Sequence, residues 1–93
     1  DECRDKRSLP FDFYLFEFNA MIEYDGIQHF KPIDHFGGES ALKETVKHDK
    51  IKNNYCKNNN IPLLRIRYDE DAKTALDNFL NYLITQNYYE RAN

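Results

Sequence analysis

The chain has few cysteines, no tryptophan and no long apolar run. Its two cysteines, Cys3 and Cys56, lie outside any C-x-x-C or Cys/His spacing. This pattern argues against a disulfide framework and against a structural zinc site. We therefore expect thiols in a reducing, cytoplasmic compartment. No run of 18 apolar residues and no secretory signal is visible, so we expect no association with a membrane.

A basic excess is also missing, because the net charge is -3. Domains that bind nucleic acid on their own usually carry such an excess, since neutralising phosphates supplies most of their affinity. The charge balance therefore counts against DNA binding by this segment alone. A cluster of metal-binding carboxylates would, however, leave the same acidic balance.

The composition is that of a globular domain. Hydrophobic residues make up 41% and charged residues 31% of the 93 residues, and the aromatic residues are seven Phe and seven Tyr. A single domain with a modest core is expected. Residues 1–9 are mostly polar and predict a linker that leads into a domain over residues 10–93. Because the chain starts at Asp1 rather than Met, we expect it to be part of a longer protein.

Two apolar stretches near the start alternate with a period of two and predict a β-hairpin. They are residues 11–16 and residues 20–25. A two-residue turn at Phe18-Asn19 would place Asp12 opposite Asp25, whereas a loop over residues 16–19 would place it opposite Glu23. In both registers the acids share a face, with opposed Cβ atoms about 5 Å apart.

The remaining chain predicts one further short strand segment, a helix, a strand and a helix. Gly26 ends or bulges the second strand, and residues 27–30 continue it after a bend. Ser40 is expected to cap a helix over residues 41–57 that the Asn-rich residues 58–60 stop. Residues 61–66 predict a buried strand with Pro62 at its start.

Asp69 or Asp71 then caps a final helix with an apolar stripe of Ala72, Leu76, Phe79, Leu80, Leu83 and Ile84. The order β-β-(β)-α-β-α predicts an α/β (α+β) fold with a small mixed sheet and flanking helices.

The acids of the hairpin predict a divalent metal site. Magnesium prefers oxygen ligands and keeps several waters, so Asp12 together with Glu23 or Asp25 could hold Mg²⁺, with Mn²⁺ or Ca²⁺ as substitutes. The alternative is a solvated strand face on which acids alternate with apolar residues. Carboxylates that crowd one face repel one another, which favours the metal site.

His29 and the central helix could add acid–base groups. A histidine changes charge near neutral pH and suits proton transfer. Asp49 lies on the helical stripe of Val46 and Cys56 and should face inward, whereas His48 lies on another stripe. Both cannot point at one centre, so we favour Asp49 for orienting His29, and His48 could contact a phosphate. The alternative is that each is an ordinary surface or partly buried residue.

Lysines make the central helix basic. Lys43, Lys47 and Lys50 lie on it, and Arg65 follows on the next strand. These cations could hold a DNA backbone beside the acids. A simple solvated helix face explains the lysines equally well.

Two runs of the sequence match a known group. FDFYLFEFNAMIEYDGIQHF and KHDKIKNNYCKNNNIPLLRIRY, within residues 10–68, resemble the very-short-patch repair endonuclease superfamily of the PD-(D/E)xK nucleases. The phage homing endonucleases with an E-D-x-H-D signature are the more similar branch. The resemblance implies a restriction-endonuclease-like core, with Asp12 as a metal ligand on the first strand. It also implies that His29 follows the glycine of the second strand and that Asp49 supports it.

The chain also departs from that group. Asp25 stands where E-x-K nucleases have lysine, and the Cys and His ligands of a structural zinc are missing, as is a Cys-Phe-Trp run. A histidine mechanism is implied instead, and mismatch repair is a weaker prediction than homing.

Our first hypothesis is a Mg²⁺-dependent DNA endonuclease in which His29 is the acid or base and Gln28 positions the phosphate. Its partners would be double-stranded DNA and either a second copy of the chain or an additional DNA-binding domain, in a phage or bacterial host cell. The alternatives are an inactive nuclease-like module that binds DNA or protein, a nicking repair enzyme, and a hydrolase of RNA.

Overall fold

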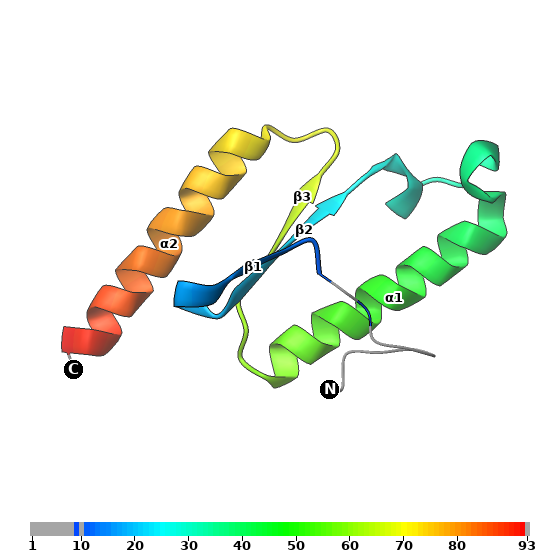
Figure 1. Ribbon diagram of the computed structural model, residues 1–93. Coiled ribbons are helices and arrows are strands. Elements are labelled where there is room, and N and C mark those ends of the chain that lie inside the picture. Colours follow the sequence, from blue (N-terminus) through cyan, green and yellow to red (C-terminus); the bar gives the residue numbers. More distant parts are fainter. Residues whose placement is uncertain (1–8, 10, 93) are drawn as a thin grey trace.

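The computed structural model describes residue 9 and residues 11–92. The strands are β1 (Phe13–Leu15), β2 (Ala20–Asp25) and β3 (Leu63–Arg67), and the α-helices are α1 (Gly38–Asn58) and α2 (Ala72–Ala92). Three short 3-10 helices complete the set: η1 (Phe16–Phe18), η2 (Ile27–His29) and η3 (Asp34–Phe36). Figure 1 shows the strands between the two helices. The expected α+β class with a small mixed sheet is confirmed.

The three strands lie in the order β1-β2-β3. β1 runs antiparallel to β2, and β2 runs parallel to β3. Parallel neighbours need a long crossover connection, and α1 supplies it. The carboxyl ends of β2 and β3 therefore meet at one edge of the sheet, beside α1.

The connection between β1 and β2 is the loop over residues 16–19, the longer of the two connections considered from the sequence. Phe13 pairs with Ile22, so one residue earlier Asp12 stands opposite Glu23. Residues 16–19 form the connection through η1 and Asn19, whose φ of 49° is a left-handed conformation that Asn tolerates. The two-residue turn, with Asp12 opposite Asp25, is wrong.

The expected strand over residues 27–30 is also wrong. These residues begin with η2, in which the His29 amide donates to the Gly26 carbonyl at 3.0 Å. The backbone therefore curls back after β2 instead of continuing the sheet, which brings the His29 side chain under the strand end.

Helix α1 begins earlier than predicted. It starts at Gly38, with Gly37 as N-cap and no side-chain cap, so Ser40 lies inside the helix. Both glycines have positive φ, of 99° at Gly37 and 66° at Gly38. A Cβ added at Gly37 would come within 2.9 Å of the Ala41 Cβ. The tight reversal of the chain, and not a serine cap, thus fixes where α1 begins.

The C-terminal elements follow the prediction more closely. Pro62 precedes β3 and its carbonyl accepts a hydrogen bond from the Met21 amide at 2.9 Å. Of the two candidate caps, Asp71 directly precedes α2 and accepts hydrogen bonds from the Thr74 hydroxyl at 2.7 Å and, through its carbonyl, from the Ala75 amide at 3.1 Å. Asp69 instead pairs with Arg67.

The apolar core is small. Its buried members are Ala20, Ile22, Cys56, Ile66 and Leu83. Cys56 is present as a thiol, and Cys3 lies outside the described residues. Of the stripe predicted for α2, Leu83 is buried and Leu76, Phe79 and Leu80 are half-buried, whereas Ala72 and Ile84 are exposed. Within the described part of the chain, neither long helix has the apolar stretch that crossing a membrane requires.

Candidate metal centre

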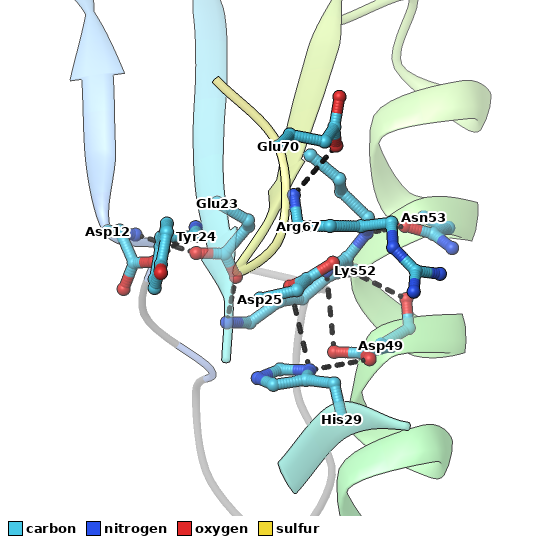
Figure 2. Close-up of polar contacts among 11 residues, drawn as sticks. Asp12, Glu23, Tyr24, Asp25, His29, Asp49, Lys52, Asn53, Arg67 and Glu70 are labelled. Atoms are coloured by element: carbon cyan, nitrogen blue, oxygen red, sulfur yellow. Dashed lines mark hydrogen bonds and ion pairs between the residues drawn. The ribbon is translucent and has the colours of Figure 1, made fainter. Parts of the chain in front are cut away.

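Two carboxylates are buried near the end of β2. Glu23 is 4% exposed and Asp25 is 5% exposed. Alternate residues of a strand face the same side, so both acids face away from Ile22. The ion pair of Glu23 with Lys52, and the short distance of Asp25 from Asp49, place both acids on the side of the sheet that α1 covers (Figure 2). Because burying an unpaired charge is costly, each carboxylate needs partners, and the structure supplies two separate sets.

The first set joins Asp25 with His29 and Asp49. The His29 Nδ1 atom lies 2.9 Å from Asp49 Oδ2 and 3.5 Å from Asp25 Oδ1. The three side chains come from β2, η2 and α1 and point toward one another (Figure 2). With Nδ1 carrying its proton and donating to Asp49, the Nε2 atom of a neutral His29 is the acceptor.

This Asp25–His29–Asp49 cluster fits a divalent cation. Each of the three residues offers one ligand atom, and these atoms lie within 4.8 Å of one another. Carboxylate oxygens suit Mg²⁺ and Mn²⁺, and imidazole nitrogen is accepted by several transition metals. The cluster therefore offers donors that could hold a metal ion, and Asp25 rather than Glu23 is the strand-end acid among them.

Arg65 on β3 fills the space between the two carboxylates. Its Nη1 atom lies 2.8 Å from Asp25 Oδ1 and 3.4 Å from Asp49 Oδ1. Its Nη2 atom donates to the Asp49 carbonyl at 3.3 Å, and its Nε atom donates to Asn53 Oδ1 at 2.7 Å. One guanidinium thus holds β2 and α1 together at the cluster.

Burial raises the pKa of Asp25 above its ordinary value, and the neighbouring charges of Arg65 and His29 oppose that rise only in part. The proton is therefore held more tightly by this carboxyl in the folded chain than in the unfolded chain. A bound cation would offset the free-energy cost of burying the Asp25 carboxylate in its charged form.

The second set joins Glu23 with Lys52 and the start of β1. The Lys52 ammonium group donates to Glu23 Oε1, and the Asp12 amide donates to Glu23 Oε2 at 2.9 Å. The Asp12 carboxylate in turn accepts a hydrogen bond from the Tyr24 amide at 2.7 Å. Asp12 and Glu23 are therefore neighbours, but their carboxylates are engaged with the protein and lie outside the Asp25–His29–Asp49 cluster.

Apart from Arg65, the other side chains that the sequence singled out lie away from the cluster. His48 pairs with Glu44 on the same helix at 3.4 Å. Gln28 is half-buried with its amide oxygen 2.5 Å from the position of a Cβ on Gly26, so it packs on the glycine. Lys43, Lys47 and Lys50 are exposed on α1. Arg65, expected at a DNA surface, points into the cluster instead.

Sequence reasoning missed Lys52. It lies three residues after Asp49, and residues at this spacing share a face of a helix. Once Asp49 was assigned to the inward face, the same phase placed Lys52 there too. The signal was available but was obscured by four other lysines on the same helix.

Comparison with known proteins finds a viral relative that is similar in sequence over most of this chain. The chain is 33% identical over 78 residues to "Uncharacterized protein 307L" of Invertebrate iridescent virus 6. The match covers 82% of this chain but only 40% of the viral protein, so the chain spans less than half of that relative's length. No family model matches the sequence, and no solved structure matches it.

Proposed function

We propose that the chain is the catalytic domain of a metal-dependent DNA endonuclease. The observation that supports the proposal is the convergence of Asp25, His29 and Asp49 from three separate elements on one point. Two carboxylates and one imidazole at this spacing combine ligands for a hard cation with a group that can move a proton at neutral pH. The resemblance of residues 10–68 to the repair and homing nucleases names two of these residues, His29 and Asp49, whereas Asp25 stands where E-x-K nucleases have lysine.

In this proposal Asp25 and Asp49 hold Mg²⁺, or Mn²⁺ in its place, with water completing the coordination. A cation so held would polarise a scissile phosphate and lower the pKa of an attacking water. Asp49 orients His29 through the contact at Nδ1, and the Nε2 atom accepts or donates the proton. Lys52 pairs with the neighbouring Glu23 and holds its side chain in place.

The proposed substrate is double-stranded DNA. Lys43, Lys47 and Lys50 are spaced by four and three residues, so their exposed side chains lie along one face of α1. A row of cations of this kind neutralises backbone phosphates without reading sequence. Because the net charge is -3, this segment alone should bind DNA weakly. In this proposal a second copy of the chain or another domain recognises the target.

The homing type, rather than mismatch repair, remains the favoured subclass because the zinc ligands and the Cys-Phe-Trp run are missing from the sequence. The relative encoded by a virus is consistent with a nuclease carried by a mobile or viral genome. The proposed place of action is the cytoplasm of the host cell.

A second candidate is a module that binds DNA without cutting it. One observation favours it, because each buried acid already has an internal cation: Lys52 for Glu23 and Arg65 for Asp25. A fold that compensates its own acids is stable without a metal. This candidate predicts DNA binding that Mg²⁺ does not alter, and no cleavage.

The test is nicking of supercoiled plasmid by the full-length protein with Mg²⁺ and with excess chelator. We expect cleavage with Mg²⁺ only, and a loss of about 10²- to 10⁴-fold in His29→Ala, the range of general acid–base catalysis. Asp49→Asn should lose activity similarly. Asp77→Ala is the matched control, because Asp77 pairs with Lys73 on the exposed face of α2. Cleavage that survives both cluster substitutions would remove the proposed chemistry.

A further inference from the structure

Arg65 stands where a divalent cation would share the two carboxylates. Its Nη1 atom contacts both, at 2.8 Å from Asp25 Oδ1 and 3.4 Å from Asp49 Oδ1. Its side chain is 20% exposed, so solvent screens its charge only partly. A divalent cation and a guanidinium a few ångströms apart repel each other strongly in such a setting.

Building on the proposed function, we infer that Arg65 competes with the divalent cation for Asp25 and Asp49. In the metal-free chain Arg65 compensates the two carboxylates and keeps β2, β3 and α1 assembled. Cation binding requires the guanidinium to withdraw from Asp25. Arg65 is thus a positioning residue that sets how tightly the centre takes up metal and how stable the empty centre is.

The other contacts of Arg65 show how it could withdraw without leaving the site. Nε donates to Asn53 Oδ1 at 2.7 Å, and Nη2 donates to the Asp49 carbonyl at 3.3 Å. Neither acceptor is a proposed metal ligand atom, because the proposal assigns the metal to the carboxylate oxygens of Asp25 and Asp49. A rotation of the planar guanidinium can therefore move Nη1 from Asp25, with loss of the contact between Nε and Asn53, while Nη2 still donates to the Asp49 carbonyl.

The test is isothermal titration of the metal-free, full-length protein with Mn²⁺ and Mg²⁺. Arg65→Met keeps an unbranched apolar side chain in place of the aliphatic stem of arginine and removes the charged guanidinium. We expect it to tighten metal binding roughly 10- to 100-fold, the range that one lost charge-assisted hydrogen bond represents. The same variant should melt at a lower temperature than the wild type without metal, and metal should raise its melting temperature by more than it raises that of the wild type.

Arg67→Met is the matched control on the same strand. Arg67 pairs with Asp69 at 2.9 Å on an exposed surface, so its loss should leave metal affinity unchanged. Asn53→Ala is the second variant, for the case that Arg65→Met does not fold. It removes only the hydrogen bond to Nε and should tighten metal binding by roughly 2- to 10-fold, as expected for one ordinary hydrogen bond.

The outcomes separate this inference from the proposed function. Tighter binding in Arg65→Met or Asn53→Ala than in the wild type and Arg67→Met supports the competition. If the wild type binds metal and Arg65→Met binds it equally or more weakly, the competition is overturned and the proposed function stands. Absence of binding in every form, with only a lower melting temperature in Arg65→Met, overturns both and makes Arg65 a purely structural ion-pair partner.

Discussion

Replacing Lys52 with methionine tests the pair that sequence reasoning missed. The side chains of Glu23 and Lys52 are 5% and 15% exposed, so removing the lysine leaves a buried carboxylate with the Asp12 amide as its remaining named donor. Breaking a buried ion pair by removing one partner typically costs about 3–5 kcal/mol. Because Lys52 retains some exposure, we take the lower value of about 3 kcal/mol.

For a domain of this size each kcal/mol lowers the melting temperature by about 4–8 °C, so Lys52→Met should melt about 12–24 °C below the wild type. The double variant Glu23→Gln with Lys52→Met should regain part of this loss, because it removes the unpaired charge. A double-mutant cycle measured by urea unfolding should then give a coupling energy above about 1 kcal/mol.

Lys73→Met is the control for this cycle. Lys73 also pairs with an acid, Asp77, at 2.9 Å, but its side chain is 85% exposed. Exposed pairs of this kind contribute about 0–1 kcal/mol. If Lys52→Met were no more destabilising than Lys73→Met, the argument that Glu23 depends on Lys52 would be refuted.

Two further predictions concern the proton and the phosphates. Burial raises the pKa of Asp25 in the folded chain, so folding favours the protonated form of this carboxyl. The free energy of unfolding of the metal-free wild type should therefore fall, relative to that of Asp25→Asn, as the pH rises from the ordinary pKa of an aspartate through the raised pKa of the folded chain. Urea unfolding of both forms across that range measures the difference, and a difference that does not change with pH contradicts it. Replacing Lys43, Lys47 and Lys50 with glutamate should weaken DNA binding at every sequence and reduce the slope of log affinity against log salt by about 2.7, or 0.9 for each phosphate contact. Lys73→Glu should leave that slope unchanged in the same titration.

Much of the fold follows from the pattern of the sequence. Alternation over residues 20–25 places Glu23 and Asp25 on one face, and the helical phase of Asp49 with the buried Cys56 turns Asp49 inward, although Val46 on the same stripe is exposed. Both are consequences of backbone periodicity, so they could be predicted without knowing how the elements pack.

The remaining features depend on contacts between elements. Residues 27–30 were expected to continue β2 after a bend, but a hydrogen bond from the His29 amide to the Gly26 carbonyl closes a 3-10 turn instead. The pairing of Arg65 with Asp25 requires the parallel register of β2 against β3, which local pattern does not encode. The start of α1 was mispredicted because the left-handed Gly37 and Gly38, rather than Ser40, determine it.

Strand β2 contributes apolar side chains to the core on one face and carboxylates to the other face. This double role limits which changes of sequence the strand can accept. Ala20 and Ile22 are buried in the core, while Glu23 and Asp25 on the same strand turn toward Lys52 and Asp49 of α1. A slip of one residue would move every side chain of β2 to the opposite face, driving carboxylates into the core and isoleucine to the acid side. Insertions or deletions within β2 should therefore be lethal to folding, so that descendants of this chain would lose the acids by substitution while keeping the length of the strand.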